Sequence, residues 1–160
     1  MNSVHLVCFR IGKETYGVDI STVREIVRVE EITRVPGTPA FMLGVVNLRG
    51  RILSVVDLGH HLSLTPSTVT GSSRILVTQL DGVMVGFLVD AATEVAKISA
   101  DQVEPPPAFT GSIEVEYLEG VAKSRNELII ILNLNKVLGS GQAAAVAGAA
   151  NGATVPAESL

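Results

Sequence analysis

The sequence predicts a mostly β fold of the barrel or sandwich type. Short runs rich in Val, Ile and Leu recur along the chain, separated by Gly, Asp, Ser or Pro at spacings typical of such folds. The apolar fraction is 47% and the aromatic fraction only 4%, so the core must be aliphatic. The 160 residues are long enough for one domain. Strands are predicted at residues 4–11, 15–18, 27–35, 52–58, 73–80, 83–89, 94–98, 118–122 and 128–133.

Between the predicted strands at 15–18 and 27–35, the sequence predicts a short helix over residues 19–26. Asp19 or Ser21 can cap its first amides, and Ile20, Val23 and Ile26 fall on one face at a spacing of three. A helix this short depends on tertiary packing. The single cysteine, Cys8, lies in an apolar run and is expected to be a small buried thiol without a disulfide partner.

A second short helix is predicted over residues 38–44. Thr38 can cap it, and Pro39 fits the first helical position, where the missing N–H removes no hydrogen bond. Further along, Asp81-Gly82 separates two aliphatic runs and predicts a type I′ hairpin turn. The strand after that turn is apolar on both alternating faces, which predicts burial on both sides.

The chain after residue 104 changes character. The three prolines of residues 105–107 predict a stiff, extended connection. Residues 133–138 predict a last helical turn, stopped by Gly139. Residues 139–160 are rich in Ala and Gly and have no hydrophobic periodicity, so we expect one domain over residues 1–138 followed by a flexible tail.

Charge and hydropathy exclude several classes of function. The net charge is −4 and the basic residues form no stripe, so nucleic acid is not expected as a partner. No run approaches the length needed to span a membrane, and the first residues lack the pattern of a secretory signal. We expect a soluble cytoplasmic protein without direct membrane insertion.

Catalytic and metal-binding signals are poor. The adjacent pair His60-His61 points its rings in different directions on a strand or a helix, and we expect solvated loop histidines. No phosphate loop or nucleophile elbow is present. A two-carboxylate site would require the fold to bring Asp57 and Asp90 together, but Asp at a strand end commonly caps a turn. We expect no enzyme, no metal and no cofactor.

Residues 38–50, which read TPAFMLGVVNLRG, followed by ILSVVDL over residues 52–58, closely resemble the signature of the CheW family of chemotaxis coupling proteins. Upstream, Phe9-x-Ile11-Gly12-x-Glu14-x-Tyr16-Gly17-Val18-Asp19-Ile20 supports the resemblance, which covers roughly residues 4–138. It implies two five-stranded SH3-like β-barrel subdomains on a shared hydrophobic core.

The resemblance also implies a function that depends on binding other proteins. Such proteins are non-catalytic adaptors that bind the regulatory domain of the CheA histidine kinase and the cytoplasmic tip of a methyl-accepting chemoreceptor, in arrays at the membrane. An adaptor of a chemosensory-like system that drives pili or development is the alternative. A small-molecule-binding barrel that uses Asp57 and Asp90 is a third hypothesis.

By motif, the resemblance assigns receptor or kinase coupling to Val23, Glu25, Gly44, Arg49 and Val95. Val23 and Val95 would line an apolar groove, Gly44 would let a receptor helix approach closely, and Arg49 would bind carboxylates or carbonyls at the junction. The alternatives are core packing for Val23, a solvated Glu25, and an intramolecular pair that clamps the turn for Arg49.

Three residues of the strand over 52–58 are candidates for the kinase contact: Ile52, Leu53 and Val55. The sequence does not determine which of them point outward. Two features depart from the family pattern, Ser54 in place of the Pro often found there and Gly59-His60-His61 in place of charged residues. Partner choice is therefore expected to differ in detail.

Overall fold

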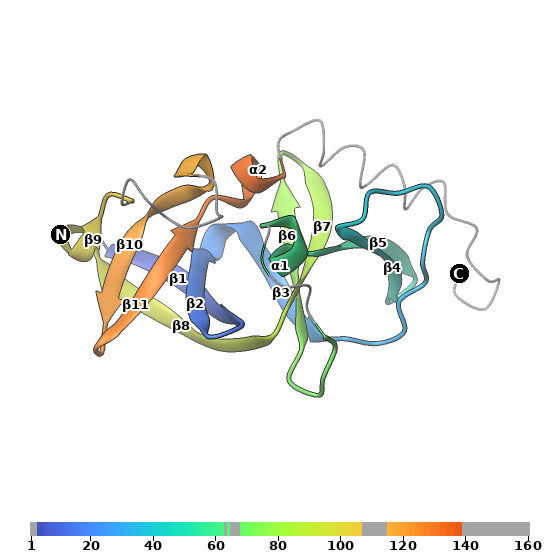
Figure 1. The fold of residues 1–160 in the computed structure, drawn as a ribbon, viewed down its shortest axis with the longest axis horizontal. Helices are drawn as coiled ribbons and strands as arrows, with labels where there is room; N and C mark the ends of the chain where they lie inside the picture. The colour runs from blue at the N-terminus through green and yellow to red at the C-terminus, as the bar shows by residue number, and fades with distance from the viewer. Residues whose placement is uncertain (1–2, 63, 65–67, 107–114, 139–160) are drawn as a thin grey trace.

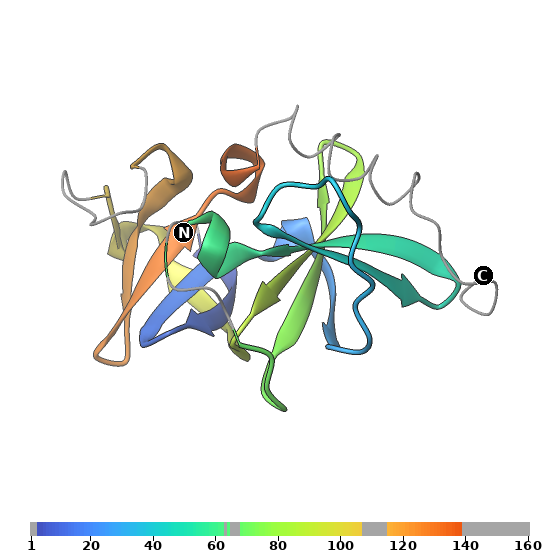
Figure 2. The ribbon, with the colours of Figure 1, turned by 45° about the vertical axis from the view of Figure 1, so that its right-hand side comes forward.

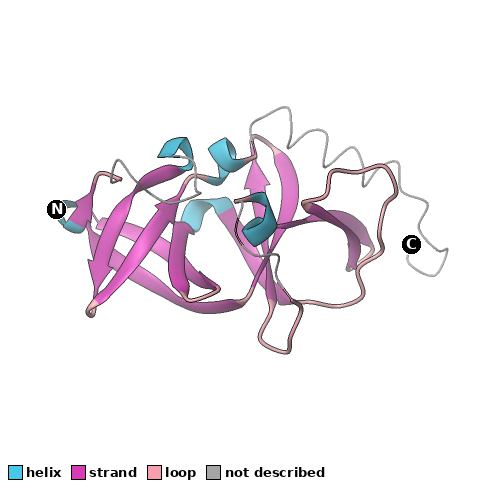
Figure 3. Ribbon diagram, viewed as in Figure 1, coloured by secondary structure: helices cyan, strands magenta, loops and turns pink. Residues whose placement is uncertain are grey.

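The computed structural model describes residues 3–62, 64, 68–106 and 115–138. These residues form two β-sheets with a few single-turn helices, and the predicted fold class is confirmed (Figures 1 and 3). The strands are β1 (Ser3–Ile11), β2 (Glu14–Asp19), β3 (Val23–Arg28), β4 (Met42–Leu48), β5 (Arg51–Asp57), β6 (Arg74–Leu80), β7 (Val83–Val89), β8 (Ala91–Ser99), β9 (Val103–Glu104), β10 (Leu118–Ser124) and β11 (Glu127–Leu132). The helices are η1 (Ile20–Thr22), α1 (Leu58–His61), η2 (Ala100–Gln102), η3 (Val115–Tyr117) and α2 (Leu134–Val137).

The two sheets form two units that lie side by side along the long axis of the molecule (Figure 1). The six-stranded unit has the order β8-β1-β2-β11-β10-β9, and the five-stranded unit has the order β3-β6-β7-β5-β4. Neighbours are antiparallel except for β2 with β11 and β5 with β7, which are parallel. The N-terminal hairpin therefore belongs to the same sheet as the C-terminal strands.

Burial divides the apolar side chains into three clusters. One fills the interior of the six-stranded unit and includes Leu6, Ala122 and Ile131, and a second fills the five-stranded unit. The third and largest lies between the units and takes side chains from both sheets and from α1 and α2. It includes Val7, Phe9, Tyr16, Val18, Val56, Leu58, Leu76, Val85, Phe87, Leu132, Leu134 and Val137. This shared core matches the packing that the family resemblance implies.

The hairpin turn at Asp81-Gly82 is confirmed. Both residues have positive φ, 49° and 81°, and Leu80 pairs with Val83 across the turn. The following strand, β7, is buried from Val85 onward, as its two-sided apolar pattern predicts. The helical turn near the C-terminus is also confirmed as α2, whereas residues 139–160 lie outside the described part of the chain.

The helix predicted over residues 38–44 is wrong. Thr38 donates its hydroxyl to the Val35 carbonyl instead of capping a helix, and a single turn closes where the Met42 amide donates to the Pro39 carbonyl. From Met42 the chain is strand β4, because its aliphatic side chains pair with β5. Gly44 has a φ of 147°, which no α-helix accommodates.

The helix predicted over residues 19–26 is wrong beyond its first turn. Asp19 caps η1 by accepting the Ser21 amide at 2.9 Å, and the β-branched residues that follow form β3 against β6. The strand predicted over 27–35 begins earlier, at Val23, and ends at Arg28. Beyond it the chain pairs with the sheet again through an isolated bridge from Thr33 to Val45.

The two units are built on the same plan. The hairpin β1–β2 corresponds to β6–β7, the edge strand β8 corresponds to β3, and β10–β11 followed by α2 corresponds to β4–β5 followed by α1. The parallel pairing falls at the same place in both, with Ile131 beside Gly17 in one unit and Val55 beside Gly86 in the other. The chain is therefore an internal repeat with exchanged hairpins.

The repeat extends to single hydrogen bonds. The Asp57 amide donates to the Phe41 carbonyl, and the Asn133 amide donates to the Tyr117 carbonyl, both at 2.8 Å. Asp57 caps α1 and Asn133 caps α2 through their side chains. The separation between residues 41 and 117 is the same as that between 57 and 133, so the two segments match without insertion or deletion.

Candidate partner-binding site

The turn between β4 and β5 places Arg49 at one end of the molecule. Arg49 and Gly50 both have positive φ, 52° and 84°, and Leu48 pairs with Arg51 on either side. The Gly50 amide donates to the Asn47 side-chain oxygen at 2.7 Å. Figure 2 shows that β4 and β5 extend away from the six-stranded unit. Arg49 therefore stands on a tight, hydrogen-bonded turn.

Arg49 forms a bidentate ion pair with Glu25 of β3. The two guanidinium nitrogens lie 3.0 and 2.5 Å from the two carboxylate oxygens. The side chains are 68% and 33% exposed. These hydrogen bonds and the guanidinium charge lower the pKa of Glu25 below its ordinary value. Since β3 and β4 are opposite edges of the sheet, the pair ties the two edges together.

Gly44 lies beside the contact between Thr33 and Val45, where the chain after β3 meets β4; we call this contact the seam. The bridge between Thr33 and Val45 is made by two backbone hydrogen bonds of 2.8 and 2.7 Å. A Cβ on Gly44 would lie 2.2 Å from the Thr33 carbonyl oxygen. The close approach predicted there for a receptor helix is thus made by the chain's own backbone, and this side of Gly44 does not face a partner.

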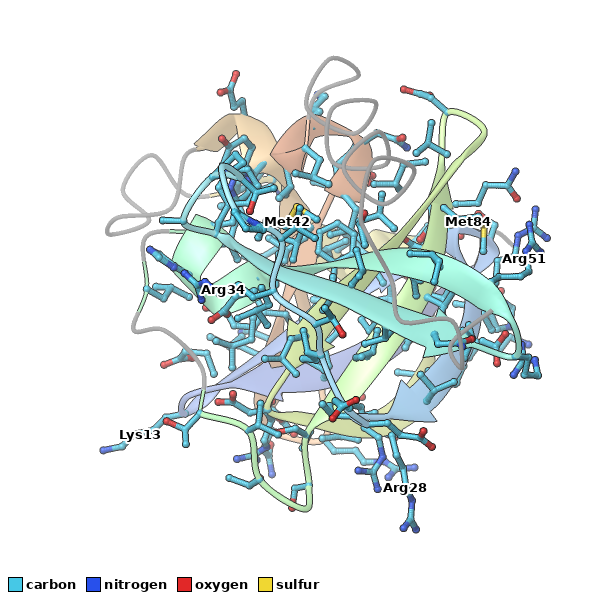
Figure 4. The ribbon with its side chains drawn as sticks, turned by 90° about the vertical axis from the view of Figure 1, so that its right-hand side faces the viewer. Lys13, Arg28, Arg34, Met42, Arg51 and Met84 are labelled. Carbon is cyan, nitrogen blue, oxygen red and sulfur yellow. The ribbon has the colours of Figure 1, made fainter. Side chains whose placement is uncertain are left out.

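A small hollow opens beside the seam. Its volume is about 160 Å³, and it is lined by Glu30, Glu31, Thr33, Val45, Val46, Asn47 and Ile52. In the end-on view of Figure 4, Arg28 and Arg51 extend outward, whereas Met42 lies within the body of the molecule. The end of the five-stranded unit is therefore a polar rim around an aliphatic interior.

The predicted apolar residues lie at the edges of the shared core. Val23 is half-buried and packs against this core. Val95 is 55% exposed and stands opposite the buried Val7, so its side chain lies on the same sheet face as that core. It is on β8 of the six-stranded unit, whereas Val23, Glu25, Gly44 and Arg49 belong to the five-stranded unit.

Ile26 is a further surface residue that the sequence analysis missed, because it assigned residues 19–26 to a helix. Ile26 is 39% exposed and stands opposite Leu76 of the shared core. By the internal repeat it is the counterpart of Val95, since both follow a glutamate on an edge strand next to a register shift. Residues 23–28 read VREIVR and do not alternate between apolar and charged, so the only strand signal in this segment was its three β-branched residues.

The CheW-like domain model matches residues 5–142 of this chain. The chain belongs to the CheW family. A probable chemotaxis protein CheW of Rhizobium etli is 34% identical over 81% of this chain and 83% of its own length. The protein FrzA of Myxococcus xanthus is 33% identical over 88% of both chains. The crystal structure of the scaffolding protein TtCheW from Thermoanaerobacter tengcongensis has 35% identity and a TM-score of 0.79, covering 89% of this chain and 92% of that one.

Two of the three predicted kinase contacts are not at the surface of this CheW-family fold. Leu53 and Val55 are buried in the interior cluster of the five-stranded unit. They are two residues apart on β5, so both side chains point to the same face of the strand, which is the interior face. Ile52 is half-buried and lines the hollow beside the seam, so it alone of the three is accessible to a partner.

The polar residues that suggested chemistry have local structural roles. The Asp57 carboxylate accepts the His60 amide at 3.2 Å, and the Asp90 carboxylate accepts the Gly12 amide at 2.7 Å. Neither residue lines the hollow. The CheW family is a family of non-catalytic scaffolds, and this chain is one of them.

The histidine pair was wrongly expected to be in a solvated loop. His60 and His61 lie in α1, and His61 Nε2 is 2.6 Å from the Val137 carbonyl oxygen of α2. The His61 ring also packs on Phe41, with 4.2 Å between ring centroids. Within the described part of the chain, no group of three or more potential metal-ligating side chains is present, and no helix is long and apolar enough to cross a membrane.

Proposed function

We propose that this chain couples a CheA-type histidine kinase to the cytoplasmic tip of a methyl-accepting chemoreceptor. The observation that carries the proposal is the match of the CheW-like domain to residues 5–142. Chemotaxis proteins named CheW resemble the chain over most of their length. An adaptor needs accessible, rigidly held surfaces and no reaction centre, and this proposal assigns such surfaces to two places in the fold.

The receptor surface in this proposal is the edge of the shared core. Val23, Ile26 and Val95 present apolar area beside the junction of the two units. A helix that docks on such a surface buries its own apolar side chains, and nearby polar groups set its orientation. Glu25 belongs to β3, the strand that carries Val23 and Ile26, and its ion pair with Arg49 holds that strand. The rigidity of this pair lowers the entropic cost of binding.

The kinase surface in this proposal is the end of the five-stranded unit, around Ile52 and the hollow beside Thr33 and Val45. The regulatory domain of the kinase would pack there, barrel end to barrel end. Each contact is small, and an array joins many of them, so weak single affinities add up to stable assembly through multivalency. In this way the adaptor would be recruited to receptor arrays at the membrane.

The test is binding of the purified chain to the two cognate fragments, the kinase regulatory domain and the receptor tip, by isothermal titration calorimetry. We expect dissociation constants on the order of micromolar for each fragment. Absence of binding to both fragments would refute the proposal. A deletion strain that retains swimming chemotaxis but loses pilus-driven or developmental behaviour would assign the same coupling role to the alternative system.

A further inference from the structure

The six-stranded unit contains a second ion pair, between Arg125 and Glu94. Arg125 Nη1 lies 3.9 Å from Glu94 Oε1, and the side chains are 86% and 44% exposed. Arg125 and Asn126 form the turn between β10 and β11, and both have positive φ, 52° and 64°. Glu94 lies on the edge strand β8. Neither residue was a candidate from the sequence.

This pair occupies the place of Glu25 and Arg49 in the repeated plan. The separation between Arg49 and Arg125 equals that between residues 41 and 117, and the two arginines have the same φ of 52°. Glu94 and Glu25 each lie next to a register shift in an edge strand, and each is followed by an exposed apolar residue, Val95 or Ile26. An incidental surface contact would not repeat in this way.

The second pair also joins strands that no backbone ladder joins. β8 hydrogen-bonds to β1, whereas β10 hydrogen-bonds to β9 and β11. A side-chain link from the β10–β11 turn to Glu94 therefore restrains β8 from the side opposite β1. The geometry is looser than at Arg49, with one long contact in place of two short ones, so its effect should be smaller.

We infer that Glu94 and Arg125 are a second positioning pair, which holds the edge of β8 and thereby presents Val95 to the partner. Its effect on binding rests on the proposed function, because Val95 is assigned there to the receptor surface. Its effect on β8 itself does not depend on that assignment. The two consequences can therefore be measured separately.

The experiment compares Arg125→Ala with Lys123→Ala and with the charge reversal Glu94→Arg/Arg125→Glu. Lys123 is an exposed cation on the same hairpin, and it forms no ion pair within the described residues. Hydrogen exchange of the β8 amides is followed by mass spectrometry, and the probe for binding is the purified tip fragment of a cognate chemoreceptor. Both are measured at about 0.1 M and about 1 M NaCl, since high salt screens exposed charges.

We expect Arg125→Ala to raise exchange in β8 and to weaken binding, each by about two- to fivefold at low salt. Lys123→Ala should change neither, the charge reversal should restore both, and the differences should shrink at high salt. Equal exchange in Arg125→Ala and Lys123→Ala, or no recovery in the charge reversal, would overturn the inference. If wild-type protein does not bind the tip, the proposed function fails, and the exchange data alone decide whether the pair holds β8.

Discussion

At the scale of single residues, Arg49 and Glu25 show how a surface pair is made specific. Arg49 lies in the turn with positive φ, and its guanidinium donates two hydrogen bonds to the carboxylate of Glu25 on β3. Exposed pairs of this kind contribute little to stability. Their value lies in orientation, since a planar guanidinium held by a carboxylate presents its remaining donors in a defined direction.

The first prediction concerns Arg49→Ala. The variant should remain folded, with a thermal midpoint by circular dichroism within a few degrees of wild type, but it should bind the receptor tip about three- to tenfold more weakly. Lys123→Ala is the matched control. A large loss of thermal stability with binding unchanged per folded molecule would mean that Arg49 only clamps the turn.

The second prediction concerns pH. Arg49 lowers the pKa of Glu25 in the folded state, so the pair stabilises the fold fully above the ordinary pKa of glutamate, about 4.3. That stabilisation is lost as the pH falls through the lowered value. The difference in urea midpoint between wild type and Arg49→Ala should therefore be constant from pH 7 to pH 5 and shrink as the pH falls further below the ordinary pKa of glutamate. A difference that does not shrink at low pH would contradict this cause.

The third prediction concerns Cys8. Its side chain is buried in β1, and burial raises the thiol pKa to about 11. Native protein at pH 8 should react with a thiol-specific disulfide reagent at least about 100-fold more slowly than protein unfolded in urea. Rapid reaction of the native protein would show that β1 opens readily from the sheet.

At the scale of elements, a helix, strand or turn was predicted correctly when adjacent residues alone determine its conformation. The Asp81-Gly82 turn and the helical turn within residues 133–138 depend only on neighbouring residues, and both were predicted. The segments over 19–26 and 38–44 carry helix caps in sequence, yet they form strands because partners distant in the chain, β6 and β5, supply the ladder. The same dependence on distant strands explains why the sequence did not determine whether Leu53 and Val55 point into the core or toward solvent.

The candidate site was predictable to the same degree. Glu25 and Arg49 were named from motif resemblance. An intramolecular pair for Arg49 was foreseen as an alternative, but Glu25 was not predicted to be its partner. Glu94 and Arg125 were not foreseen. The repeat that relates them to the first pair is weak in sequence. His61 of α1 and Val137 of α2, for example, occupy equivalent positions of the repeat but are different types of residue. Only the backbone register makes the correspondence visible.

The fourth prediction concerns Gly44 in β4. Gly44→Ala places a Cβ 2.2 Å from the Thr33 carbonyl oxygen and also strains a φ of 147°. Urea unfolding should show a loss of about 2–4 kcal/mol. Gly50→Ala is the control, because that position has positive φ but open space around the added carbon, and it should lose about 1 kcal/mol. Equal losses would mean that the seam relaxes at little cost.

At the scale of the whole molecule, the shared core makes the two units one cooperative structure. Phe9 and Tyr16 of one sheet stack at 6.0 Å and belong to the same cluster as Val85 and Phe87 of the other. Neither sheet covers this face by itself, so each unit in isolation would expose a large apolar surface. Surfaces on both units are thereby held at a fixed angle to each other.

The fifth prediction concerns Val85, which is fully buried in the shared core. Val85→Asp buries an unpaired charge and should abolish the folded state of both units together, seen as loss of the β-sheet circular dichroism signal at 25 °C. Val69→Asp, at an exposed position, should leave the spectrum unchanged. Survival of half the signal with a second, separate melting transition would show that the units fold independently.

The exchange of hairpins between the units has a consequence for biosynthesis. β3 to β7 are contiguous in the chain, so the five-stranded sheet can form once β7 has left the ribosome. The hairpin β1–β2 precedes all of these strands in the chain, but its sheet neighbours β8 and β11 are synthesised only after β7. During that interval its edges and the apolar face bearing Phe9 and Tyr16 are uncovered, which is the situation that chaperones protect. The earliest strands are therefore among the last to reach their final neighbours.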